Sequence, residues 1–78
     1  MQTYEVNDVV RLAVSLPEHD LVQGAAGAVV ECFTRPNRAY EVEFVGRDGR
    51  TAVQLTLQAD QLTVYEAVQP SKIGAAGA

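Results

Sequence analysis

Apolar and polar residues alternate with a period of two along most of this chain up to residue 65. The clearest example is the stretch 39–45, where three apolar residues on one side alternate with Glu41 and Glu43 on the other. This period is typical of β-strands that bury one face and expose the other. No comparably long stretch has the period of a helix. The pattern therefore predicts five short strands, at residues 9–14, 28–34, 39–45, 51–57 and 62–65.

Turn-forming residues separate the predicted strands. Gly24 and Gly27 precede the second strand, where glycine favours a positive φ or a close approach of two backbones. The stretch Arg35-Pro36-Asn37-Arg38 has proline and asparagine in the order that β-turns prefer. Asp48-Gly49 is the strongest hairpin signal in the chain, because primed turns require a positive φ.

Five strands that bury one face are closed most economically into a small barrel, which removes exposed strand edges. We therefore expect an all-β fold: a small five-stranded antiparallel SH3-like barrel with a short 3₁₀ turn near Gln58–Gln61. The barrel domain is expected to span residues 1–68, with a flexible C-terminal tail at 69–78. Within the N-terminal arm, Tyr4 is expected to cover an open end of the barrel.

The second strand supplies the candidates for an interaction surface. With Glu31 facing water, the alternation points three residues inwards: Ala28, Val30 and Cys32. The same alternation places Val29 and Phe33 on the outer face, where apolar side chains indicate a covered surface. We take four residues as partner-binding candidates, with core or rim packing as the alternative: Val29, Phe33, Tyr65 and Tyr4.

Length and composition restrict the fold further. The 78 residues suffice for a single domain. One cysteine excludes an intrachain disulfide, and one histidine beside it is too few for a structural zinc site. Because so small a core leaves a thin margin of stability, association with another chain is expected to add buried area.

Charge and hydropathy limit the partners and the compartment. The net charge is −4, and no basic face is evident, which argues against nucleic acid as the main partner. A nucleic-acid function would need Arg35, Arg38, Arg47 and Arg50 to converge on one face. The chain has no secretory signal and no apolar run of membrane-spanning length, so we expect a cytoplasmic protein that does not enter a membrane.

Residues that could take part in catalysis or metal binding are few, and each has a simpler structural interpretation. Cys32 is favoured as a small buried residue over a reactive thiol. His19 lies in a polar loop and is favoured as solvated over a general base or a metal ligand. Glu41 and Glu43 share a strand face with Glu31 nearby, an arrangement more often a solvated face than a metal or hydrolase site. We therefore assign no catalytic, cofactor-binding or metal-binding residue and expect no enzyme activity.

Several stretches are similar to a small bacterial family of unknown function with an SH3-like barrel. The resemblance covers roughly Tyr4 to Tyr65 and rests on Asn7-Asp8-Val9-Val10-Arg11-Leu12, Leu16-Pro17-Glu18, the segment 24–31, Val42-Glu43-Phe44 and Asp48-Gly49-Arg50-Thr51. It implies the fold and an accessory, antitoxin-like or immunity-like role, and it implies no catalytic residues. Fold likeness alone is weak support for a function.

Three functions remain open from the sequence. The leading hypothesis is a non-enzymatic protein-interaction module that associates with itself, as a homo-oligomer, or with a protein partner. The second is an SH3-like barrel associated with nucleic acid or the ribosome. The third is a small metal-binding protein or enzyme that uses His19 and the carboxylates.

Overall fold

The computed structural model describes residues 3–46, 48–50 and 52–65, and within them the fold is all-β. The predicted C-terminal tail lies outside the described residues. Five strands form one antiparallel sheet in the order β4-β3-β2-β1-β5. Their bounds are β1 Val9–Leu12, β2 Ala26–Phe33, β3 Ala39–Val45, β4 Ala52–Leu57 and β5 Leu62–Val64.

Two short 3₁₀ turns complete the fold. The first, η1 at Pro17–His19, lies in the long loop after β1, and the second, η2 at Ala59–Gln61, joins β4 to β5. The second turn confirms the prediction made for residues 58–61. Together with the five antiparallel strands, it confirms the predicted all-β class.

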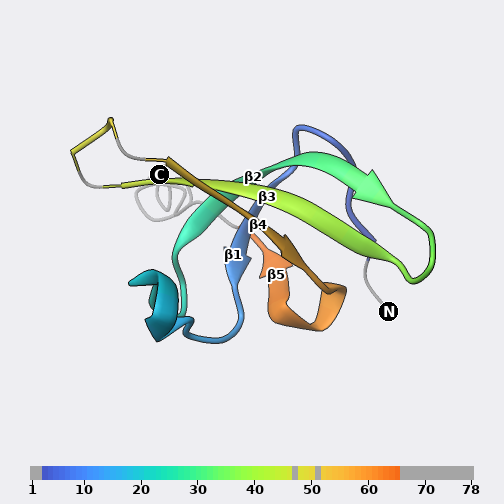
Figure 1. Cartoon of the computed structure of the whole chain (residues 1–78), viewed down its shortest axis with the longest axis horizontal. Coiled ribbons are helices and arrows are strands. Elements are labelled where there is room, and N and C mark those ends of the chain that lie inside the picture. Colours follow the sequence, from blue (N-terminus) through green and yellow to red (C-terminus); the bar gives the residue numbers. More distant parts are fainter. Residues whose placement is uncertain (1–2, 47, 51, 66–78) are drawn as a thin grey trace, which may run out of the picture.

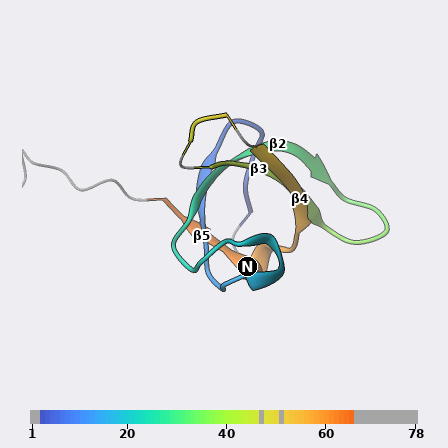
Figure 2. The same ribbon diagram turned by 60° about the vertical axis from the view of Figure 1, so that its left-hand side comes forward.

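The sheet curls on itself (Figure 1 and Figure 2), and apolar side chains fill the space that it encloses. β2 is long and bends along its course, so that it pairs first with β1 and then with β3. The inner faces of the strands supply most of the core, and the N-terminal arm and the long loop close it. The buried apolar residues are Tyr4, Val10, Leu12, Leu16, Val29, Tyr40, Val42, Phe44, Leu57, Ala59 and Leu62.

A β-bulge in β2 reverses the predicted orientation of the residues up to the bulge and leaves that of the residues after it unchanged. Val29 lies opposite Val42, but Glu31 lies opposite Glu41, so β2 holds one extra residue between these pairs. The extra residue is Val30, and the in–out alternation changes phase there. Val29 is consequently fully buried and Val30 is 38% exposed, so the expected outward Val29 and inward Val30 are both wrong.

Gly24 and Gly27 have the two roles that the sequence indicated. Gly24 has a φ of +94°, the left-handed region that favours glycine. Gly27 has no room for a side chain, because a Cβ there would lie 2.8 Å from the Phe44 ring and 2.9 Å from the Glu43 carbonyl oxygen. The Phe44 ring thus packs directly on the backbone of β2, next to the bulge.

Candidate functional site

The four predicted interface residues do not form one surface. Tyr4 and Val29 are buried in the core, with 7% and 0% of their surface exposed. Val29 is therefore not available to a partner, because the bulge turns it inwards. Phe33 at the end of β2 is half-buried, and Tyr65 directly after β5 is 37% exposed.

Tyr65 and Phe33 lie in different parts of the sheet. Tyr65 is beside β1, where the Arg11 guanidinium carbon sits 4.5 Å from the centre of its ring. Arg11 also donates from Nη1 to the Gly24 carbonyl oxygen at 2.8 Å. One face of the Tyr65 ring is thereby covered by this cation–π contact. Phe33 instead borders a hollow at the far end of β2.

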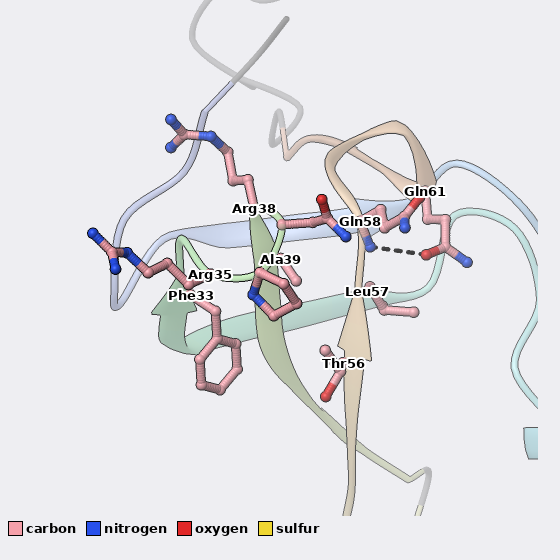
Figure 3. Close-up of a pocket in the computed structure, with 10 residues that line it drawn as sticks. Phe33, Arg35, Arg38, Ala39, Thr56, Leu57, Gln58 and Gln61 are labelled. Atoms are coloured by element: carbon pink, nitrogen blue, oxygen red, sulfur yellow. Dashed lines mark hydrogen bonds between the residues drawn. The ribbon is translucent and has the colours of Figure 1, made fainter.

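That hollow lies between the β2–β3 turn, the end of β4 and η2, and its volume is about 420 Å³ (Figure 3). Pockets that hold small molecules commonly fall between about 300 and 1,000 Å³. We call it the turn hollow. Its lining residues are Phe33, Arg35, Pro36, Asn37, Arg38, Ala39, Thr56, Leu57, Gln58 and Gln61.

The walls of the turn hollow are positioned by local sequence. One wall is the turn that Pro36 and Asn37 form, and the Arg35–Pro36 peptide bond is cis. The other wall is η2, where the Gln58 backbone N–H donates to Gln61 Oε1 at 2.8 Å and the Gln61 N–H donates to the Gln58 carbonyl oxygen at 3.0 Å. The Gln61 side chain is therefore held across the turn (Figure 3). Sequence reasoning did not select Gln58 or Gln61, although it predicted the 3₁₀ turn that holds them.

Charge distinguishes the turn hollow from the rest of this acidic chain. Arg35 and Arg38 are both exposed at its rim, and Figure 3 shows their guanidinium groups extending away from the ribbon. Among the described residues that line the hollow there is no carboxylate. One lining residue, Thr56, is hydrogen-bonded to an acid: its hydroxyl donates to Glu41 Oε1 at 2.6 Å. Within the described residues, neither arginine has an ion pair, so both remain able to bind an anionic group.

The four arginines that a nucleic-acid surface would need do not converge. Arg38 immediately precedes β3 and Arg50 follows its other end. A strand of this length spans roughly 20 Å, so the two residues mark opposite ends of the sheet. Arg47 lies outside the described residues.

The candidate residues for catalysis or metal binding stay dispersed. His19 is exposed on η1 and borders a second hollow of about 190 Å³, together with Leu16, Glu18 and the end of β4. Glu31 and Glu41 lie opposite each other across the β2–β3 ladder. Over the described part of the chain, no group of three or more His, Cys, Asp or Glu residues is arranged to hold a metal ion.

Cys32 is exposed, so its expected burial is wrong. It lies opposite the buried Tyr40 on the inner side of the ladder, but at an open end of the sheet. Its S–H donates to the Tyr4 carbonyl oxygen at 3.5 Å. This contact ties the N-terminal arm to β2.

Comparison with known proteins places this all-β domain in a family. A family model described as Domain of unknown function (DUF4926) matches residues 6–64. The chain belongs to this family. The match begins in the N-terminal arm and ends at the last residue of β5, so it spans the whole sheet.

No curated protein and no solved structure matches the chain. In the part of the chain that is described, no helix has the length and apolar character needed to cross a membrane.

Proposed function

We propose that this chain is a non-enzymatic protein-interaction module, a bacterial cytoplasmic SH3-like barrel that binds a segment of a protein partner in the turn hollow. The strand order and the 3₁₀ turn before the last strand support the SH3-like part of the proposal. An accessory role, antitoxin-like or immunity-like, fits a domain of this size. The observation that carries the proposal is the combination of an apolar floor with two arginines that have no ion pair within the described residues.

The lining residues define the chemistry of a suitable segment. Phe33, Pro36 and Leu57 offer apolar surface to one inserted side chain. Arg35 and Arg38 suit a carboxylate nearby, because a guanidinium binds a carboxylate through two parallel hydrogen bonds. The half-buried aromatic beside arginine also resembles the composition of interface centres. We therefore expect a partner segment with an aliphatic or proline residue close to Asp or Glu.

Selection from phage-displayed peptides on the immobilised chain tests this proposal. The selected peptides should combine Asp or Glu with an apolar residue, and fluorescence polarisation should measure their affinity. Arg38→Ala and Phe33→Ala should each weaken binding by at least about tenfold, which corresponds to about 1.4 kcal/mol. Arg50→Ala is the matched control, because it removes the same charge at the opposite end of β3.

Two results would contradict the proposal. One is a set of selected peptides that bind the wild-type chain and Arg38→Ala equally well. The other is salt-sensitive retention of the chain on RNA or DNA that Arg38→Ala and Arg50→Ala both reduce, which would favour the nucleic-acid alternative.

A further inference from the structure

The strand β4 forms one edge of the sheet, and its outer side has no partner in the described structure. β4 pairs with β3 from Ala52 to Leu57. Among the described residues, no backbone hydrogen bond joins β4 to any other segment. A row of unpaired N–H and C=O groups on such an edge is a template for another strand.

The sequence of β4 lacks the usual protection of an exposed edge. It reads Ala-Val-Gln-Leu-Thr-Leu and contains no charge, no proline and no glycine. Natural proteins generally protect an edge with lysine, proline or a bulge, and an uncharged β-forming segment of six residues is otherwise prone to aggregate. The neighbouring β3 carries two glutamates by comparison. An edge of this composition is best explained by a strand that covers it.

The inner face of β4 is also incompletely covered. Leu57 is buried, but Val53 and Leu55 are only half-buried although they point to the core. An additional strand beside β4 would place its own inward residues next to these two. The hollow of about 190 Å³ beside Leu55 and Leu57 shows that η1 does not seal this part of the edge.

The described charged residues nearest the two ends of β4 have opposite signs, which favours an antiparallel copy as the covering strand. Arg50 precedes β4, Asp60 follows it, and neither has an ion pair within the described residues. If β4 pairs antiparallel with a copy of itself, Arg50 of one copy meets the end that bears Asp60 of the other copy. A parallel arrangement would instead bring like charges together.

We propose that a second copy of this chain adds its β4 antiparallel to this β4 and forms a continuous ten-stranded sheet around a two-fold axis. Residues directly opposite each other in a sheet point to the same face. The inward residues of the two copies therefore lie opposite each other when the two-fold axis passes close to Gln54 or Leu55, in the middle of β4. The uncharged strand allows this self-pairing despite the net charge of −4. This surface adjoins the turn hollow at Thr56 and Leu57, but the dimer forms through the backbone edge of β4 and does not require a partner segment in the hollow.

Light scattering after size exclusion, from micromolar to near-millimolar concentration, tests the dimer. The expected mass at high concentration is twice the 8.4 kDa of the chain. Gln54→Lys places two like charges near the two-fold axis and should weaken dimerisation by at least about tenfold. The variant should fold, because Glu43 lies directly opposite residue 54 and can pair with the new lysine.

Gln23→Lys is the matched control, because Gln23 is exposed in the loop between η1 and β2 and belongs to no strand. Hydrogen exchange gives a second measurement: amides of β4 should become more protected as concentration rises, whereas those of β5 should not. A chain that stays monomeric at the highest concentration would overturn the proposal. So would a dimer that Gln54→Lys weakens no more than Gln23→Lys, or one without concentration-dependent protection in β4.

Discussion

The ring of Tyr4 stands edge-on to the ring of Tyr40, with the ring centres 5.4 Å apart and the planes at 81°. The Tyr4 backbone N–H also donates to the Tyr40 hydroxyl at 3.2 Å. These two contacts join residues 36 positions apart and attach the N-terminal arm to β3. The arm closes the end of the core beside Tyr40 in this way, as the sequence indicated for Tyr4.

Tyr4→Ala should therefore destabilise the domain strongly. The substitution removes a buried aromatic ring, a change that typically costs about 3–5 kcal/mol in a core. Because Tyr4 lies near the chain terminus and its site can relax, we expect about 3 kcal/mol. Urea unfolding followed by circular dichroism measures the loss. Tyr65→Ala is the control, since Tyr65 is partly exposed, and an equal loss in both variants would contradict the role given to Tyr4.

The buried phenol of Tyr4 should make stability depend on pH in alkaline solution. Burial of the ring raises the pKa of Tyr4 above its ordinary value of 10.0, and the nearby Tyr40 adds to the effect. The folded state thus favours the protonated phenol. The stabilisation that this phenol contributes is complete below about pH 10, where Tyr4 is protonated in the unfolded chain as well. It is lost as the pH rises through the raised pKa of Tyr4 in the folded state.

Tyr4→Phe keeps the ring and removes the titrating proton. The variant should show a shallower fall in the free energy of unfolding above about pH 10 than the wild-type chain. Urea unfolding over a series of alkaline pH values measures how steeply the free energy of unfolding falls with pH in the variant and in the wild-type chain. Identical slopes would show that burial of the Tyr4 phenol does not affect stability.

The adjacent valines of the β2 bulge should respond very differently to substitution. Val29→Ala leaves a cavity opposite Val42 and should cost about 2 kcal/mol, near the value for burying a valine side chain. Val30→Ala removes a side chain that is 38% exposed and should change stability by less than about 1 kcal/mol. Paired chemical denaturation curves compare the variants. The reverse order would mean that β2 continues without a bulge.

Gly27→Ala should also be destabilising, for a reason that involves Phe44. The new methyl group would lie 2.8 Å from the Phe44 ring, which must shift at a cost of about 1–3 kcal/mol. Phe44→Leu removes part of the obstructing ring. The double variant should therefore lose less stability than the sum of the two single variants. Strict additivity in a double-mutant cycle would show that the ring and residue 27 are not in contact.

Much of the fold follows from local pattern. In β3, alternation of apolar residues with Glu41 and Glu43 predicts both the strand and its buried face, and both are confirmed. The 3₁₀ turn at residues 59–61 and the special backbone at Gly24 are likewise consequences of nearby residues. These features could be predicted because turn chemistry and a period of two act over a few residues.

The candidate site could be predicted only in part. Phe33 was identified from its outward position, but the residues that complete the turn hollow come from two segments distant in sequence. Pro36 belongs to the β2–β3 turn, whereas Gln58 and Gln61 belong to η2. Their proximity follows from the register of the β3–β4 hairpin, in which Tyr40 lies opposite Leu57. The Asp48-Gly49 signal predicts the hairpin but not this register.

The sequence by itself determined the strands, the turns and the all-β class, because these depend on alternation and turn residues within short windows. Tertiary structure alone decided which of Val29 and Val30 is buried, because two adjacent valines carry no difference in polarity and only the register against β3 distinguishes them. It also decided that Phe33 and Tyr65 lie on separate surfaces, and that β4 is an edge, because strand order is set by long-range pairing.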